Sequence, residues 1–284
     1  MLSRAALVVL ALPLVTACAA ARTTAAAPPG SPTAFDPAKS DAKAIAVADQ
    51  VLATVGAPAW AGVKELRWTT QIFDGDKTML RAEQAWDRWN GRAYLKNVPQ
   101  QEGASPTMAM YELYGDTAAA IVESASGMKE RANAENSREI LKKAKERFAQ
   151  DQYWVTMHLR LKDPGVHLKF VEERPAEGST SNEPKFDVLQ IGFDAGVGPP
   201  AGPTYYLIVD KTTHLPDAVE MSEMKDGQER RIGYRYQDWT DVGGIKFATT
   251  RQNIGLASEK LTFADVKVSA TPDEDLYTPP VGIQ

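Results

Sequence analysis

Apolar residues recur every three or four positions in two stretches of the chain, which is the spacing of one face of an α-helix. The first stretch begins after a candidate cap at Ser40 or Asp41 and ends at Gly56. Its apolar positions are Ala44, Ile45, Ala48, Val51, Leu52 and Val55. The second stretch begins at Ser137, and its apolar positions are Ile140, Leu141, Ala144 and Phe148. These patterns predict amphipathic helices over 41–55 and 137–149.

Most of the remaining chain alternates apolar and polar residues with period two, which predicts β-strands. The predicted strands cover 63–73, 79–89, 92–98, 107–114, 153–161, 166–172, 186–193, 204–209, 218–224, 229–238, 244–253 and 260–269. Turn signals such as Asp74-Gly75-Asp76 and Asn90-Gly91 separate them. Because a parallel crossover needs a dozen or more residues, such short connections join antiparallel neighbours.

A sheet of so many twisted strands curls, and its concave face needs an apolar cover. The two predicted helices are the candidates for that cover. The length of the chain allows one large domain or two small ones, and no internal repeat divides it. We therefore predict an α+β fold, mostly β, in which a large curved antiparallel sheet (a half-barrel) wraps around helices as a single domain over 40–284.

The first residues have the composition of a leader that is removed. Arg4 places a positive charge near the start of the chain. The apolar run over 5–14 that follows it is far shorter than the roughly 18 residues that span a bilayer. Small residues precede Cys18, the only cysteine of the chain. The stretch Leu14-Val15-Thr16-Ala17-Cys18 resembles the lipobox of bacterial lipoproteins. That resemblance implies cleavage after residue 17, a diacylglyceryl thioether on Cys18 and acylation of the new terminus.

The alternative is an ordinary secretory signal that is cut near Ala19-Ala20-Ala21, so that Cys18 is discarded. A chain with no second cysteine has no disulfide use for Cys18, which favours the lipid role. Several acyl chains, at about 0.8 kcal/mol per buried methylene, make a permanent anchor. Since Ala19 is not the aspartate associated with inner-membrane retention, we expect the protein in the cell envelope, attached to the outer membrane and facing the periplasm.

Beyond the predicted signal peptide over 1–17, the segment 18–39 consists mostly of Ala, Thr, Pro, Gly and Ser, which predicts a flexible tether. The net charge of −5 becomes −6 when residues 1–17 are removed, because Arg4 leaves with them. So acidic a chain has no electrostatic footprint for nucleic acid, and we expect no nucleic-acid partner. The sequence leaves the oligomeric state open.

Several segments resemble the superfamily of periplasmic lipoprotein carriers, which contains the lipoprotein localisation factors and many envelope proteins of unassigned function. The segments are 86–92, 153–166, 186–189, 206–216 and 236–239. Together they cover most of 45–280, and the resemblance implies the same half-barrel fold. It implies no single activity, because members carry lipids, lipoproteins or nothing demonstrated.

The chain offers little for catalysis. Its three histidines are His158, His167 and His214, and no Gly-x-Ser-x-Gly element accompanies them. His214 lies in a predicted turn, whereas His158 and His167 lie on successive predicted strands and would come close across a hairpin. A metal pair or a hydrolase site built from them would still need a clustered carboxylate. We predict no catalytic residue, no metal site and no cofactor, and keep an enzyme as the third hypothesis.

Tryptophan and methionine stand out on the predicted strands. The candidates for lining a ligand cavity are Trp68, Trp86, Trp89, Met108, Met110, Trp154 and Met157. Rigid indole rings with adaptable thioethers suit ligands of irregular shape. The leading hypothesis is a membrane-anchored protein that binds a hydrophobic small molecule, an acyl chain or a lipid, in the concavity of its sheet. The alternative is a non-catalytic structural or interaction module of the envelope, in which the same side chains fill the core.

Overall fold

The strands form one continuous antiparallel sheet. The computed structural model describes residues 25–176, 178, 183–199, 203–225 and 227–280. The strands are β1 (Glu65–Asp74), β2 (Lys77–Asp87), β3 (Arg92–Asn97), β4 (Thr107–Glu112), β5 (Ala118–Glu123), β6 (Lys129–Arg131), β7 (Val166–Pro175), β8 (Pro184–Phe193), β9 (Thr204–Asp210), β10 (Pro216–Lys225), β11 (Gln228–Val242), β12 (Ile245–Asn253) and β13 (Glu259–Ser269). Their order in the sheet is β6-β5-β4-β3-β2-β1-β13-β12-β11-β10-β9-β8-β7. Among these described strands, only β1 and β13 pair without being consecutive in the chain.

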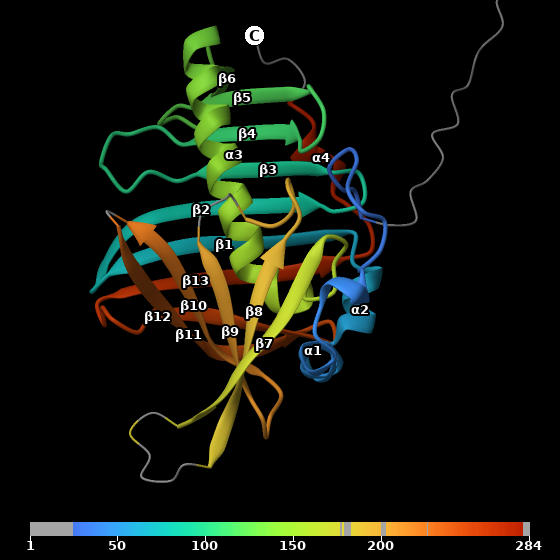
Figure 1. Cartoon of the computed structure of the whole chain (residues 1–284). Helices are drawn as coiled ribbons and strands as arrows, with labels where there is room; N and C mark the ends of the chain where they lie inside the picture. Colours follow the sequence, from blue (N-terminus) through green and yellow to red (C-terminus); the bar gives the residue numbers. More distant parts are fainter. Residues whose placement is uncertain (1–24, 177, 179–182, 200–202, 226, 281–284) are drawn as a thin grey trace, which may run out of the picture.

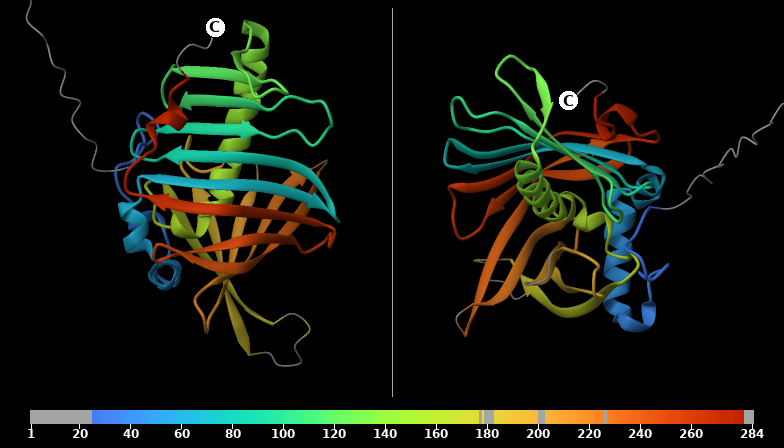
Figure 2. Two further views of the ribbon diagram at one scale, coloured as in Figure 1. Left: turned by 180° about the vertical axis from the view of Figure 1, so that it is seen from behind. Right: turned by 90° about the horizontal axis from the view of Figure 1, so that it is seen from above.

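Helices cover the concave side and one end of this sheet. Within the described part of the chain they are η1 (Pro37–Lys39), α1 (Ala42–Val55), α2 (Ala57–Gly62), α3 (Ala134–Thr156), η2 (Met157–Leu159) and α4 (Glu274–Tyr277). The sheet curls around α3, while α1 and α2 lie beside the strand ends (Figure 1, Figure 2). The predicted fold class, a mostly β half-barrel wrapped around helices, is confirmed. None of the helices in the described ranges is both long and apolar enough to cross a bilayer.

The end of α1 is fixed by a close approach of two backbones. Gly56 has a φ of +85°, and its N–H donates to the carbonyl of Leu52. A Cβ at this position would lie 2.0 Å from the carbonyl oxygen of Gly244, in the turn between β11 and β12. Only glycine fits such a site, because it tolerates positive φ and carries no Cβ. This contact seats α1 and α2 on the end of the half-barrel.

Helix α3 is longer than the sequence pattern predicts, and the predicted strand over 153–161 is wrong. Asn133 caps the helix by accepting the N–H of Asn136 at 2.9 Å. The last residues of α3, Tyr153 to Thr156, are all buried. A helix end that is covered on every side has no polar face, so its apolar residues lose the helical period. His158 therefore lies in η2, and the expected hairpin between His158 and His167 does not form.

Residues 25–39 contact the domain at several points. Ala26 donates its N–H to the carbonyl of Arg88 at 2.6 Å, and Phe35 packs against the core. Lys39 forms an ion pair with Asp194 at 3.0 Å. The signal peptide, Cys18 and residues 19–24 of the predicted tether lie outside the described residues.

The outer edge of β7, the last strand of the sheet order, is covered by residues 40 and 41. The hydroxyl of Ser40 accepts the N–H of Leu168, and the carboxylate of Asp41 accepts the N–H of Phe170, each at 2.9 Å. Asp41 also donates its own N–H to the carbonyl of Leu168. These contacts satisfy backbone groups that an open edge would leave exposed.

Candidate ligand-binding site

The centre of the concave face is filled by aromatic side chains. Phe148 points from α3 into a group of three rings on the sheet, Trp68, Trp86 and Tyr111. Its ring centroid lies 5.8 Å from Trp68, 6.4 Å from Trp86 and 6.2 Å from Tyr111. All four side chains are buried. At these distances the rings pack edge to face and at tilted angles, as in a protein core.

A buried polar network ties α3 to the same strands. Gln84 donates from Nε2 to Asp151 at 2.7 Å and to Thr70 at 3.0 Å, and the indole N–H of Trp68 also donates to Thr70. Asp151 is fully buried and forms an ion pair with Arg147 one turn earlier. Burial raises the pKa of Asp151, while Arg147 opposes that rise. Because buried polar groups need specific partners, the network fixes the helix in one position.

A second buried charge lies near the end of α3. Arg251 is fully buried and donates to the carbonyls of Ala248 at 2.8 Å and Trp154 at 3.0 Å. Its guanidinium lies 3.5 Å from the centre of the Tyr236 ring. Burial lowers the pKa of Arg251. The arginine thus joins α3 to the sheet through backbone carbonyls and a cation–π contact.

The histidines do not form a reactive group. His158 donates from Nε2 to the carbonyl of Lys246 at 2.9 Å, and burial lowers its pKa to about 3, so it is neutral at pH 7. His167 pairs through Nε2 with Asp194 at 2.8 Å. Among the residues that the structure describes, no group of three or more His, Cys, Asp or Glu side chains is placed to hold a metal ion.

A pocket of about 580 Å³ lies on the concave side next to α3, and we call it the flank pocket. Its lining includes Ala149 of α3, Ile191 and Phe193 of β8, Val197 of the connection that follows β8, and Tyr205 of β9. Phe193 packs edge to face on Tyr205, at 6.2 Å between centroids. Gly198 completes this wall, since a Cβ there would lie 2.5 Å from the Phe193 ring. The lining is mostly apolar.

The rim of the flank pocket is charged. Asp194 lines it and lies within 3.0 Å of both Lys39 and His167. These two partners lower the pKa of Asp194, Lys39 being the larger cause. The carboxylate is therefore ionised and already paired. A ligand would meet a mostly apolar wall, and the Asp194 carboxylate beside it already has two partners.

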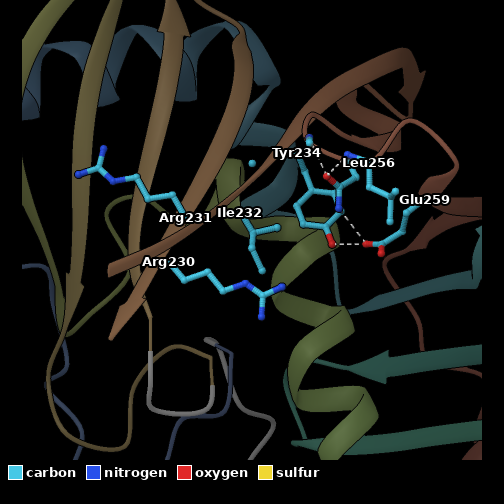
Figure 3. Close-up of a pocket in the computed structure, with 9 residues that line it drawn as sticks. Arg230, Arg231, Ile232, Tyr234, Leu256 and Glu259 are labelled. Carbon is cyan, nitrogen blue, oxygen red and sulfur yellow. Dashed lines mark hydrogen bonds between the residues drawn. The ribbon is translucent and has the colours of Figure 1, made fainter. Parts of the chain in front are cut away.

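A second pocket of about 310 Å³, the rim pocket, lies where β11 extends beyond β12 (Figure 3). Arg230, Ile232 and Tyr234 line it from β11, and Leu256 and Glu259 line it from the other side. The hydroxyl of Tyr234 donates to Glu259 at 2.5 Å. Burial and the Glu259 carboxylate raise the pKa of Tyr234. This hydrogen bond therefore joins two residues of the pocket lining.

The seven predicted cavity residues are not brought together. Trp68, Trp86, Trp154 and Met157 belong to the main core. Met108 and Met110 lie in a separate cluster with Ile121, because alternate residues of β4 face opposite sides of the sheet. Trp89 is half-buried in the turn after β2, beneath the Lys64 ammonium. None of the seven lines either pocket.

The residues of the flank pocket were not singled out from the sequence. Ile191, Phe193 and Tyr205 do fall on predicted strands, and alternation alone would place Ile191 and Phe193 on one face. The sequence pattern does not predict the path of α3, which brings Ala149 opposite these residues. That path depends on the curl of the whole sheet.

Comparison with known proteins finds solved structures that are similar to this chain, but no matching family model or curated sequence. A DUF1329 family protein from Desulfovibrio piger is similar in structure, with 10% identity, a TM-score of 0.47 and coverage of 83% of this chain and 97% of the other. A putative outer membrane lipoprotein-sorting protein domain from Vibrio parahaemolyticus has 12% identity, a TM-score of 0.45 and coverage of 83% and 96%. A LolA superfamily protein from Nitrosomonas europaea has 13% identity, a TM-score of 0.44 and coverage of 83% and 97%.

Proposed function

We propose that this protein is a lipid-anchored envelope protein that faces the periplasm and binds an apolar molecule, such as an acyl chain, in the flank pocket. The pocket itself carries the proposal. Its volume of about 580 Å³ falls within the range of roughly 300–1,000 Å³ that is usual for small-molecule sites. Apolar walls with a few polar groups at the entrance are also usual for such sites.

The flank pocket is a better site than the centre of the concavity. A ligand in the centre would have to displace Phe148, which packs against Trp68 and Trp86. Removing a buried phenylalanine from a core costs about 3–5 kcal/mol. A ligand in the flank pocket displaces no core side chain. We therefore place the proposed ligand beside α3. A ligand cavity lined by the seven residues named from the sequence stays a prediction.

The anchor is the second part of the proposal. It is supported by the lipobox-like stretch that ends at Cys18 and by the absence of a second cysteine in the sequence. Attachment to the outer membrane is proposed from Ala19. The folded part that follows is large enough to bury a core without disulfides.

The hydrogen bonds of His158 and His167 fit a protein that binds a ligand without catalysing a reaction. His158 is neutral and occupied by the carbonyl of Lys246, and His167 is occupied by Asp194. Neither lies beside a serine or cysteine nucleophile in a hydrogen bond that the structure records. A general base needs to be within reach of the proton that it removes, and these two side chains are engaged elsewhere.

A structural or interaction module is the second candidate. The filled centre of the concavity favours it, because Phe148 and its three aromatic neighbours leave α3 firmly attached to the sheet. The two candidates differ in one property, which is whether the flank pocket takes up an apolar molecule.

The test fills the pocket from α3. Protein with Cys18→Ala, produced without residues 1–17, is titrated with the uncharged fluorescent probe N-phenyl-1-naphthylamine. Ala149→Trp should weaken binding at least about tenfold, or 1.4 kcal/mol, because the indole occupies the space of the ligand. Gln150→Trp, at an exposed neighbouring position of the same helix, should leave the affinity unchanged. Thr204→Leu, from the opposite wall on β9, should repeat the loss.

The outcomes separate the candidates. Binding in the parent that both pocket-filling variants abolish, with unchanged thermal midpoints, supports the carrier. A parent that binds no probe favours the structural module. Equal weakening by Ala149→Trp and Gln150→Trp would show that the probe binds elsewhere.

A further inference from the structure

Residues 26–39 are attached to the domain near both of their ends. Ala26 donates its N–H to the carbonyl of Arg88 at 2.6 Å. Its methyl group faces Gly91, where an added Cβ would lie 3.0 Å from the Cβ of Ala26. Phe35 packs against the core, and Lys39 pairs with Asp194. For a membrane anchor, the folded body therefore begins at Ala26 and not at residue 40.

This attachment shortens the free spacer behind Cys18. Residues 18 and 26 are eight positions apart in the sequence, and an extended chain spans at most ~3.3–3.6 Å per residue, so the spacer reaches about 28 Å. From Lys77 at the start of β2 to Arg88, the chain advances eleven residues, which at ~3.3 Å per residue is about 36 Å. The start of β2 is thus farther from Ala26 than the spacer can reach.

We propose that the anchor holds the molecule in one orientation, with the bilayer surface as the partner of one end of the half-barrel. The membrane-facing end carries the turns 88–91 and 113–117. The outer end carries the turns 75–76 and 254–258. In Figure 1 the blue N-terminal segment lies on the side of the β2–β3 turn, and the β12–β13 turn lies on the opposite side. The inference rests on the proposed lipidation of Cys18.

The side chains of the membrane-facing end suit this position. Trp89 is half-buried with the Lys64 ammonium 4.5 Å from its ring centre, and Tyr114 is 41% exposed next to Gly91. Indole and phenol rings are favoured at membrane–water interfaces. Arg92 is paired with both Asp87 and Glu274, so its charge is neutralised within the domain.

The outer end has a different character. Ile254 and Leu256 are 45% and 51% exposed, and Leu256 lines the rim pocket of Figure 3. In the proposed orientation this apolar rim points into the periplasm, away from the bilayer. An apolar surface so placed is open to a soluble partner.

The test uses the absence of other cysteines. The full lipidated protein is purified from membranes with Asp116→Cys or Ser258→Cys, which lie in exposed turns at the two ends. Each cysteine is labelled with bimane and the protein is reconstituted into phosphatidylcholine vesicles that contain a headgroup spin-labelled lipid. We expect loss of bimane fluorescence at 116 and retention at 258. In Ala26→Pro/Phe35→Ala, which removes the N–H donor and the core contact, the difference should shrink.

Each result bears on the proposal. Equal quenching at both sites, or stronger quenching at 258, overturns the orientation. A difference that persists unchanged in Ala26→Pro/Phe35→Ala shows that the docked segment does not set it. The anchor is checked separately by the mass of the N-terminal peptide and by flotation with the vesicles. If the protein is unlipidated and does not float, the proposed anchor is wrong. If the protein is lipidated but both sites are quenched equally, only the proposed orientation is wrong.

Discussion

The interior of this half-barrel holds ionisable side chains that water does not reach. Asp151, His158 and Arg251 are all fully buried, and each is held by hydrogen bonds to another part of the fold. Burial disfavours the charged form of each group, so that it raises the pKa of Asp151 and lowers those of His158 and Arg251. Stability should depend on pH through these residues.

His158 gives the clearest pH dependence. Burial and the charge of Arg251 lower its pKa to about 3 in the folded state, against about 6.5 in the unfolded chain. Between about pH 3 and pH 6.5, His158 binds a proton in the unfolded chain but not in the folded protein. The contribution of His158 to stability is therefore complete above pH 6.5 and is lost as the pH falls towards 3. At pH 5 the loss amounts to about 2 kcal/mol.

His158→Gln keeps a donor for the Lys246 carbonyl but does not titrate. Urea unfolding should show that this variant loses about 2 kcal/mol less than the parent between pH 7.5 and pH 5. His214→Asn is the control, because asparagine tolerates the φ of +56° at that position. Identical pH slopes in the parent and in His158→Gln would contradict the assignment.

Gly56 offers a prediction on backbone contact. A Cβ at this position meets the carbonyl of Gly244 at 2.0 Å, while a Cβ at Gly75, also at positive φ, meets nothing within 4 Å. Gly75→Ala should cost about 1 kcal/mol for the strained φ alone. Gly56→Ala should cost about 2–4 kcal/mol, since the β11–β12 turn must also move. Equal losses in denaturant unfolding would show that the turn yields freely.

At the scale of elements, the sequence predicts the elements whose residues face both a core and solvent. Helix α1 and most strands appear within a few residues of their predicted bounds, because half-buried elements keep their period. The end of α3 loses its period because it is buried all round. Strand β5 was missed because it is rich in alanine, which has little strand preference, and α2 and α4 are too short to show a stripe.

The candidate site, too, can be predicted from the sequence only where a strand keeps its alternating pattern. The faces of β8 and β9 that line the flank pocket can be read from alternation, whereas the position of Ala149 opposite them cannot. It depends on how far the sheet curls and on a helix whose full length the pattern hides. The methionines of β4 show the converse, since Met108 and Met110 are apolar and on a strand, yet they face away from α3.

The cover on the edge of β7 can be tested by hydrogen exchange. Asp41→Ala removes the acceptor of the Phe170 N–H. We expect that amide to exchange at least about tenfold faster, because a hydrogen bond to a charged group contributes roughly 1.5–3 kcal/mol and about 1.4 kcal/mol is a factor of ten. Thr54→Ala, whose hydroxyl bonds only to its own exposed helix turn, should leave β7 unchanged. Unaltered exchange at Phe170 in Asp41→Ala would mean that another group covers this edge.

At the scale of the whole molecule, one thioether is proposed to carry the attachment to the membrane. Cys18→Ala should abolish metabolic palmitate labelling and release the protein from the membrane fraction, because the chain has no other cysteine to acylate. Ala19→Asp should stay labelled and move to the inner-membrane fraction. Unchanged fractionation of Cys18→Ala would remove the lipid anchor from the proposal.

The pairing of β1 with β13 has a consequence for how the chain is completed. These two strands meet in the middle of the sheet, although nearly the whole domain separates them in sequence. Until β13 has been synthesised and exported, β1 keeps an open edge of unpaired backbone groups, which is where chains aggregate. A premature stop after β12 would therefore not trim the sheet at its border. It would divide the sheet at its centre, and the two groups of strands in the truncated chain would each expose a strand edge to any neighbour in the periplasm.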